Sequence, residues 1–229
     1  MRFLKNELLI GKENVENLKD KNILLIGCGG VGGYCAESLI RSGIYNITIV
    51  DNDKVDITNL NRQIIALEST IGNYKVDVLK QRMIDINPHA NITKLKTFLN
   101  KENIPEIVNN KFDYVIDAID SMTSKIDLID FCYKNNINII SSMGMGNRLS
   151  PENIVITDIF KTEYCPMAKI IRKELRKRNI KKLTVCYSKN EVNKKYKTPS
   201  SMIFAPSVCG ITIAYKVIND FINESNTEE

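Results

Sequence analysis

Glycines at a fixed spacing mark a phosphate-binding turn near the start of the chain. Gly27, Gly29 and Gly32 form a G-x-G-x-x-G pattern between the apolar segment NILLIG and the segment GGVGGYCAESLIRSG. The first glycine permits a tight turn, the second lets the backbone approach a phosphate, and the third lets helix and strand pack closely. The N-terminus of the following helix offers free N–H groups to that phosphate. We therefore predict a nucleotide site that includes the backbone of Gly30 as well.

Acidic, amide and cationic residues follow this turn in an order that suits a triphosphate. Asp51 stands where a ribose hydroxyl is held, about twenty residues after the turn. A nicotinamide enzyme keeps its pyrophosphate intact, whereas an enzyme that cleaves a triphosphate must stabilise charge on the leaving pyrophosphate. Arg62 and Lys75 supply cations for that purpose. The remaining residues that we assign to the nucleotide are Asp53, Asn59 and Gln63.

Two carboxylates in the segment VIDAID are candidates for a metal ion. Asp117 and Asp120 come at the end of an expected strand, and ligands of open α/β sheets bind at the carboxyl ends of the strands. Either carboxylate could carry Mg²⁺, the usual companion of a triphosphate. The turn SSMGMG, residues 141–146, ends the next expected strand, and its backbone could approach a substrate carboxylate.

These residues need strands that alternate with helices to position them. Apolar segments predict strands at residues 22–27, 46–51, 92–97, 114–119 and 138–144. Between them, amphipathic patterns predict helices at residues 29–43, 71–88, 101–110 and 124–137. Such alternation indicates a parallel sheet covered on both faces. A further helical stretch is expected at residues 5–19.

The second half of the chain continues the pattern less regularly. We expect strands at 153–159 and 183–188 around a helix at 166–178, and a last helix at 206–222 whose small residues allow close packing. Residues 191–201 are predicted to form a mobile loop, and residues 223–229 a disordered tail. The predicted fold class is α/β, a Rossmann-like doubly wound, mostly parallel sheet with antiparallel C-terminal extension strands. Residues 1–229 would form one domain, with a nucleotide-binding core at 1–147 and a sheet extension at 148–229.

Composition restricts the class of protein. The chain has 229 residues, 43% of them hydrophobic, which suits one domain with a buried core. No apolar run approaches the roughly 20 residues of a membrane span, and the charged N-terminus lacks the apolar stretch of a signal peptide. Six cysteines occur without any Cys-x-x-Cys, which argues against structural zinc and a disulfide framework. We therefore predict a cytoplasmic protein without stable membrane insertion.

A basic segment indicates an anionic partner. Residues 161–197 hold thirteen Lys or Arg against three Glu, a local charge of +10 within a chain of net charge +5. In the helix expected at 166–178, Met167, Ile170, Ile171 and Leu175 form an apolar face. This charge excess favours phosphate binding, which would supply RNA affinity and weaken with salt. A solvated face and an anionic membrane surface are the alternatives. The predicted RNA-binding residues are Lys169, Arg172, Lys173, Arg176, Lys177, Arg178, Lys181 and Lys182.

Taken together, GCGGVGG, DNDKVDITNLNRQ, IGNYK and DAID resemble the ubiquitin-activating-enzyme superfamily, whose bacterial members include ThiF and MoeB. The resemblance implies adenylation of a carboxylate by ATP on a homodimer, with catalytic roles for Arg62, Lys75 and Asp120. It assigns Asp51 to ribose, Asn59, Arg62 and Lys75 to phosphates, and Asp120 to Mg²⁺. It also implies a monovalent cation, Na⁺ or K⁺. The chain departs from ThiF and MoeB in two ways: their zinc-binding cysteine pairs are missing, and Lys5 stands where an arginine usually reaches the neighbouring subunit's ATP.

The segment from SSMGMGNRLSPENI to VCYSKNEV is similar to the tRNA threonylcarbamoyladenosine dehydratase (CsdL/TcdA-type) branch. This implies ATP-dependent ring closure of the threonylcarbamoyl group on adenosine beside the tRNA anticodon, with tRNA as a partner and a sulfur-relay protein as another candidate. The main alternative is adenylation of a ubiquitin-like carrier protein, with Cys165 accepting a thioester. A NAD-dependent oxidoreductase and a nucleotide sensor without turnover are further alternatives.

Overall fold

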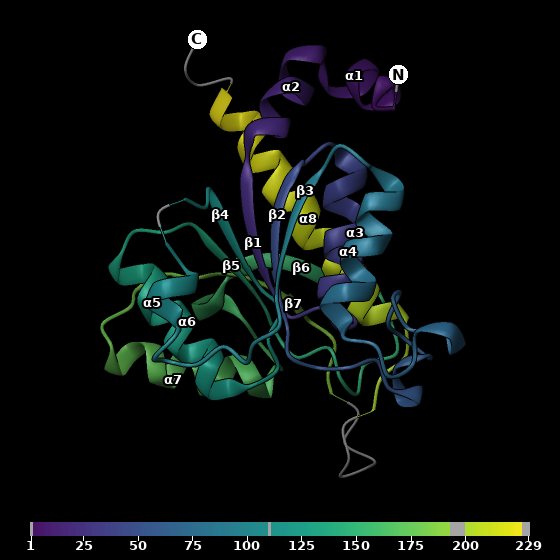
Figure 1. Cartoon of the computed structure of the whole chain (residues 1–229). Helices are drawn as coiled ribbons and strands as arrows, with labels where there is room; N and C mark the ends of the chain where they lie inside the picture. Colours follow the sequence, from purple (N-terminus) through teal and green to yellow (C-terminus); the bar gives the residue numbers. More distant parts are fainter. Residues whose placement is uncertain (1, 110, 193–199, 226–229) are drawn as a thin grey trace.

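A seven-stranded sheet forms the centre of the molecule (Figure 1). The computed structural model describes residues 2–109, 111–192 and 200–225. The strands follow the order β3-β2-β1-β4-β5-β7-β6, with β6 antiparallel to β7 and all other neighbours parallel. This confirms the predicted fold class, and it shows that only one of the two extension strands is antiparallel. The strands are β1 (Asn22–Ile26), β2 (Asn46–Val50), β3 (Asn91–Leu95), β4 (Tyr114–Asp117), β5 (Ile139–Ser142), β6 (Ile154–Asp158) and β7 (Thr184–Ser188).

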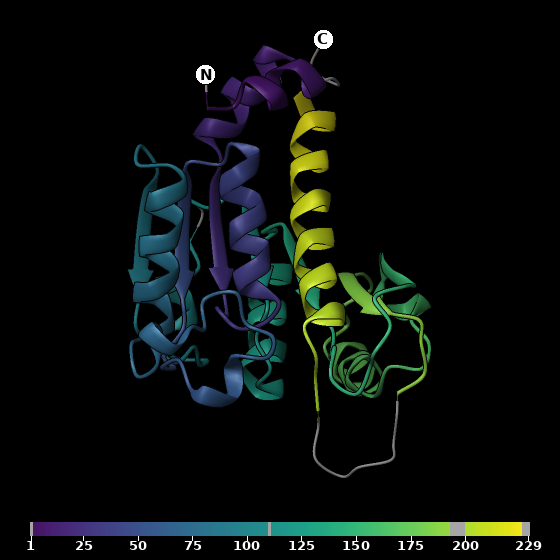
Figure 2. The same ribbon diagram turned by 90° about the vertical axis from the view of Figure 1, so that its right-hand side faces the viewer.

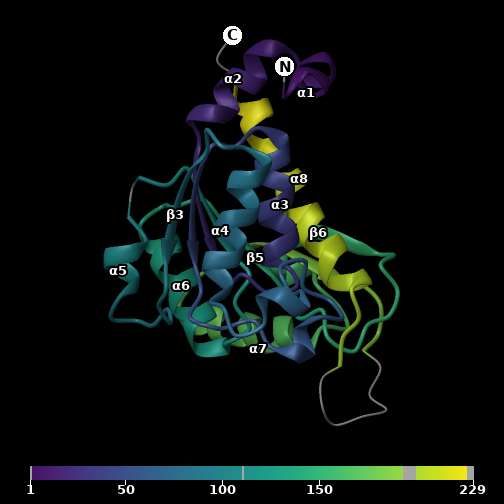
Figure 3. The same cartoon turned by 45° about the vertical axis from the view of Figure 1, so that its right-hand side comes forward.

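Helices cover both faces of the sheet (Figures 1 and 3). One face packs against α3 (Gly32–Ser42), α4 (Lys75–Ile86) and α8 (Phe204–Ser225). The other packs against α5 (Ile104–Ile107), α6 (Met122–Lys134) and α7 (Pro166–Lys177). Within the described residues, no helix combines the length and the apolar character that crossing a membrane requires.

Two predictions about local structure need adjustment, and a third is mostly untested. The N-terminal stretch forms two helices, α1 (Leu4–Ile10) and α2 (Lys12–Asp20), because Gly11 interrupts it with a φ of +87°. Residues 223–225 of the expected disordered tail belong to α8, while 226–229 lie outside the described residues. Most of the expected mobile loop, residues 193–199, also lies outside them.

The central strands are apolar on both sides because both sides are covered. In β1, Ile23 and Leu25 contribute to the core with α3 and α8, whereas Leu24 and Ile26 contribute to the core with α6. All four side chains are buried. Successive side chains of a strand point to opposite faces, so a strand between two helix layers reads as a continuous apolar run.

Helix α8 joins the sheet extension to the nucleotide-binding half. It runs beside α3 (Figure 2) and also contacts β5, β6 and β7. The contact with α3 is close at Gly210, where an added Cβ would lie 2.3 Å from the carbonyl oxygen of Val31. The small residues expected in this helix therefore do permit close packing.

We expect Gly210→Ala to destabilise the protein by about 1–3 kcal/mol, because a methyl group must push α8 away from α3. Urea denaturation measures the free energy of unfolding. Ile211→Ala is the matched control, since Ile211 is the next residue on α8 and is 49% exposed; its effect should stay within about 0.5 kcal/mol. Equal midpoints for the two variants would contradict the close packing.

Candidate active site

A cavity of about 980 Å³ lies beside the carboxyl ends of the parallel strands. Its walls come from the glycine turn after β1, the segments after β2, β3 and β4, and the turn after β5. This is the edge at which open α/β sheets bind ligands. Among the residues predicted from the sequence, the cavity is lined by Gly27, Gly29, Gly30, Asp51, Asp53, Asn59, Arg62, Gln63, Lys75 and Asp120.

The glycine turn is shaped by two very close backbone approaches. An added Cβ on Gly27, whose φ is +95°, would lie 2.5 Å from the carbonyl oxygen of Ala118. One on Gly32 would lie 1.7 Å from the carbonyl oxygen of Gly27. Gly32 therefore supports the turn from behind and does not line the cavity, whereas Gly29 faces the open side, with Gln63 Nε2 3.7 Å from an added Cβ.

Asp51 connects the end of β2 to the glycine turn. Its Oδ2 accepts the N–H of Cys28 at 2.7 Å, and its Oδ1 accepts the N–H of Asp53 at 2.8 Å. Burial, with the Asp51 charge as a second cause, raises the pKa of the Cys28 thiol well above its usual value. Cys28 therefore stays protonated at ordinary pH, which disfavours a nucleophilic role although it lies within the turn.

Both cations are held in the cavity wall. Arg62 Nη1 donates to the carbonyl oxygen of Thr58 at 2.7 Å and to Asn61 Oδ1 at 2.9 Å. Lys75 begins α4, is 6% exposed, and places its Nζ 2.7 Å from Asp53 Oδ2. These bonds keep two positive charges on one side of the cavity, where they can face phosphates.

The side-chain amides of Asn59 and Gln63 differ in their hydrogen-bond partners. Asn59 is buried, and its Oδ1 accepts the N–H of Asp56 at 3.1 Å, which stabilises a 3-10 turn over Ile57–Asn59. Gln63 is also buried, but its Oε1 has no hydrogen-bond partner among the described residues. A buried polar atom without a partner is costly, and Gln63 lines the cavity, so a bound ligand can satisfy its amide.

Asp117, the last residue of β4, and Asp120, which follows that strand, have different surroundings. Asp117 is fully buried: its Oδ2 accepts Lys125 Nζ at 2.7 Å and Ser141 Oγ at 2.5 Å. It does not line the cavity, whereas Asp120, to which the resemblance assigns Mg²⁺, does. Asp120 is exposed to the cavity and makes no hydrogen bond or ion pair with other described residues.

Comparison with known proteins identifies the family. The model of the ThiF family matches residues 4–218. The chain belongs to the ThiF family. It is 41% identical over 242 residues to the tRNA threonylcarbamoyladenosine dehydratase of Bacillus subtilis, covering 97% of this chain and 95% of that one. The Escherichia coli K12 dehydratase is 38% identical, covering 76% of this chain and 65% of that one. The crystal structure of the E. coli dehydratase TcdA with ATP matches with a TM-score of 0.94 at 30% identity, covering 100% and 96%.

Several residues of this ThiF family site were missed by sequence reasoning. Thr97, Phe98 and Leu99 follow β3 and line the cavity, and Phe98 is 51% exposed. Their position after a strand was the available signal. Of the predicted turn at 141–146, Met145 and Gly146 line the cavity, whereas residues 141–144 do not.

Lys125 was also missed. It is 0% exposed within α6 and donates to Asp117, to Ser141 Oγ at 3.2 Å and to the carbonyl oxygen of Ser142 at 3.1 Å. A lysine on the apolar side of a helix, next to Ile126, was the sequence signal for a buried partner.

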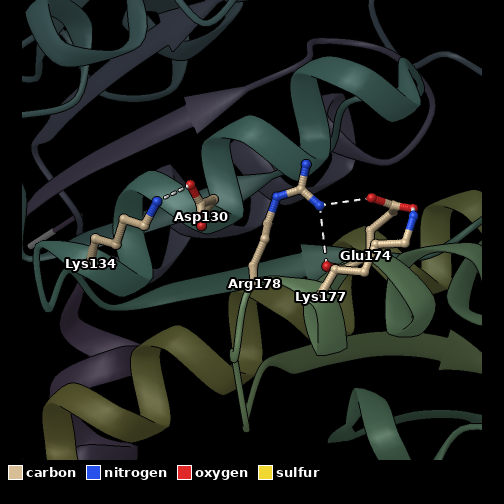
Figure 4. Close-up of polar contacts among 5 residues, drawn as sticks. All are labelled: Asp130, Lys134, Glu174, Lys177 and Arg178. Carbon is tan, nitrogen blue, oxygen red and sulfur yellow. Dashed lines mark hydrogen bonds and ion pairs between the residues drawn. The ribbon is translucent and has the colours of Figure 1, made fainter.

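The basic helix of this ThiF family member carries two kinds of cation. Arg172 Nη1 donates to the carbonyl oxygen of Thr162 at 2.9 Å, and Arg176 lies over the Phe160 ring at 5.4 Å. Figure 4 shows Glu174 with Lys177 and Arg178, at 2.7 and 2.8 Å. These two cations lower the pKa of Glu174 to about 2, so this carboxylate cancels part of the charge of α7 at ordinary pH. Among the predicted RNA-binding residues, those that are exposed and whose side chains make no hydrogen bond or ion pair with other described residues are Lys169, Lys173, Lys181 and Lys182.

Two further residues of interest lie away from the cavity. Cys165 caps α7, where its Sγ accepts the N–H of Ala168 at 3.5 Å, and it is 5% exposed. Lys5 lies on α1, at the opposite end of the sheet from the cavity of its own chain (Figure 1).

We expect Lys125→Met to destabilise the protein by about 3–5 kcal/mol, because Asp117 would stay buried without its counter-charge. Urea denaturation measures the change. The control is Lys134→Met on the same helix, since the pair of Lys134 with Asp130 (Figure 4) is exposed at the lysine and is worth less than about 1 kcal/mol. Similar losses in both variants would show that the buried pair does not stabilise the sheet edge.

Proposed function

We propose that this protein catalyses the ATP-dependent dehydration of N6-threonylcarbamoyladenosine in tRNA. The observation that carries the proposal is the gathering of the glycine turn, Asp51, Arg62, Lys75 and Asp120 around one cavity. That arrangement suits a triphosphate. The substrate class follows from the near full-length similarity to the B. subtilis dehydratase.

The chemistry requires activation of a carboxylate. A free carboxylate is a poor electrophile; its attack on the α-phosphorus of ATP forms an acyl-adenylate and releases pyrophosphate. A nucleophile in the same side chain then attacks the acyl carbon, closes the ring and expels AMP, so that one carboxylate oxygen leaves with AMP. Intramolecular attack has a high effective concentration. The reaction therefore needs no cysteine nucleophile, in keeping with the buried, protonated thiol of Cys28.

The residues of the cavity take separate roles in this proposal. Arg62 and Lys75 stabilise the negative charge that develops on the phosphates. Asp51 accepts a hydrogen bond from the ribose, and the N-terminus of α3 faces a phosphate.

Asp120 would hold the Mg²⁺ that the family implies. Its carboxylate lines the cavity without a partner among the described residues. Mg²⁺ is commonly held by one or two carboxylates together with substrate phosphates, so a single carboxylate fits this ion. When bound, Mg²⁺ neutralises phosphate charge.

A homodimer is part of the proposal, supported by the apolar surface of α1. Leu4, Leu8 and Leu9 are 46%, 71% and 84% exposed on this helix, and large apolar side chains gathered on a surface mark interaction sites. Lys5 on the same helix would approach the partner's ATP with a charge but without the bidentate fork of an arginine.

The decisive test uses tRNA that carries linear threonylcarbamoyladenosine, incubated with the protein, ATP and Mg²⁺. We expect mass spectrometry of the nucleosides after mild digestion to show the loss of one water, with AMP released. Arg62→Ala and Lys75→Ala should lower the rate of AMP release at least about 100-fold, because each removes a charge that stabilises the transition state.

Lys54→Ala is the control for these variants, since Lys54 is exposed nearby, over the ring of Tyr74, and does not line the cavity. Wild-type turnover in the Arg62 or Lys75 variant would refute their assignment. An unchanged nucleoside with the wild-type protein would instead favour adenylation of a carrier protein, which pyrophosphate exchange with candidate partners measures.

For α7 we propose that the unpaired lysines bind the RNA backbone. Lys169→Gln with Lys173→Gln should weaken binding of an anticodon stem-loop and reduce the slope of log affinity against log salt by about 2. Glu174→Gln should strengthen binding, because it releases Lys177 and Arg178. Lys134→Gln on the adjacent helix α6 is the control, and fluorescence anisotropy over a salt series is the measurement. An unchanged slope in the double variant would exclude α7 as the RNA-binding face.

A further inference from the structure

A second cavity, of about 470 Å³, adjoins the nucleotide cavity. Residues 147–150, 190–191 and 200–202 line it. Ser200 and Ser201 line both cavities, so the segment that contains them forms a shared wall. The volume of the second cavity is in the range of small-ligand sites, about 300–1,000 Å³. The cavity is too small for a folded partner.

Hydrogen bonds hold this shared wall from both sides. Three bonds join Asn147 and Ser200: the Ser200 N–H and Oγ donate to Asn147 Oδ1 at 2.7 and 3.0 Å, and the Asn147 N–H donates to the Ser200 carbonyl oxygen at 2.6 Å. On the other side, Asn61 Nδ2 donates to the carbonyl oxygen of Ser201 at 2.7 Å. Asn61 precedes Arg62, so the second cavity lies beside the residues that we assign to the phosphates.

Arg148 supplies a buried positive charge at the border between the second cavity and the nucleotide cavity. It lines the second cavity and is 6% exposed. Its Nη1 donates to the carbonyl oxygens of Gly144 at 2.7 Å and Gly146 at 3.4 Å, and its Nη2 donates to that of Tyr164 at 3.4 Å. Its Nε has no partner, and no carboxylate pairs with it among the described residues. A buried charge without a counter-ion is costly, so an anionic ligand would be stabilised here.

The mouth of the second cavity is apolar. Leu149 is 68% exposed and Met202 is 50% exposed, and both line it. Enzymes that act on a base within a nucleic acid take the base out of its stack and hold it between apolar or aromatic side chains. A purine that carries a carboxylate thus matches the walls of the second cavity. The purine suits the apolar mouth, and the carboxylate suits the cationic side chain of Arg148.

The turn held by Arg148 lies next to the basic helix α7. Tyr164, whose carbonyl oxygen accepts from Arg148, lies two residues before α7. An added Cβ on Gly144 would lie 3.8 Å from Met167 Cβ, within the first turn of that helix. An RNA backbone bound along Lys169 and Lys173 would therefore bring its bases near the cavity mouth.

We propose that the second cavity is the acceptor site of the enzyme. It holds the modified adenine, extruded from the anticodon loop, between Leu149 and Met202, and Arg148 provides the counter-charge for the substrate carboxylate. Gly146 lines the nucleotide cavity and bonds to Arg148, so the carboxylate is held at the border with ATP. This inference rests on the proposed function.

One carboxylate opposes such a ligand and provides an independent test. Glu191 is the acidic residue among the described residues that line the second cavity, and it is exposed. Its charge repels a bound carboxylate. Glu191→Gln should therefore increase affinity, the opposite direction to every other variant of the site.

The test measures binding and turnover separately. The binding probe is the free linear threonylcarbamoyladenosine nucleoside, titrated by NMR in the presence of a non-hydrolysable ATP analogue. Leu149→Ala should weaken nucleoside binding about tenfold and raise KM for modified tRNA, with the affinity for the ATP analogue unchanged. Arg148→Met should reduce nucleoside affinity about 100-fold, down to that of unmodified adenosine. Tyr133→Ala, which removes an exposed aromatic side chain from α6, is the control.

Arg148 also holds the turn at 144–146, so the exposed variants Leu149→Ala and Glu191→Gln keep the test valid if Arg148→Met does not fold. Wild-type nucleoside affinity and KM in both exposed variants would overturn the acceptor site while leaving the dehydration intact. Absence of nucleoside binding to the wild-type protein would also overturn it. If the variants alter nucleoside binding as expected but modified tRNA is never dehydrated, the acceptor site stands and the proposed function fails.

Discussion

The buried ion pair between Lys125 and Asp117 determines the sheet edge on which the site is built. Asp117 ends β4, and its register partner on the adjacent strand is Ser141. Lys125 reaches both from α6 and also binds the carbonyl oxygen of Ser142. Asp117 Oδ1 in turn accepts the N–H of Ile119 at 3.1 Å. One fully buried contact therefore sets the direction of the chain as it leaves both β4 and β5, and those exits carry Asp120, Met145 and Gly146 into the cavity.

The chemistry that we propose imposes a second constraint, which is the repulsion between two anions. A substrate carboxylate must approach the phosphates of ATP before any bond can form. Arg62 and Lys75 stand on the phosphate side, and Arg148 stands at the border with the second cavity. Cations on both sides of the meeting point lower this repulsion at short range, where the protein screens charge less than water does. The basic surface of α7 would act earlier, by attracting the RNA.

The nucleotide-binding half could be predicted from the sequence because its motifs depend on the spacing of residues along the chain. The spacing of Gly27 and Gly32 predicted the turn, and the structure shows both glycines in contacts that exclude a side chain. The end of each parallel strand predicted which edge carries the site, so Asp51 was placed beside the cavity without any knowledge of the packing. Lys75, assigned from the order of charged residues after the turn, lines the same cavity. The roles of these residues toward ATP stay proposals that the variants test.

What the sequence determined by itself was the order of strands and helices, the glycine turn and the set of charges near it, because these depend on spacing along the chain. Apart from the family resemblance, it could not tell that Asp117 is buried and Asp120 faces the cavity, since this depends on a lysine of another helix and on the register between β4 and β5. Nor could it separate the paired from the unpaired cations of α7, where Thr162 and Phe160 hold two of the arginines. Only the tertiary structure created the second cavity, because its walls combine residues 147–150 with residues 190–191 and 200–202, which are distant in the sequence and meet through the bonds of Asn147 with Ser200.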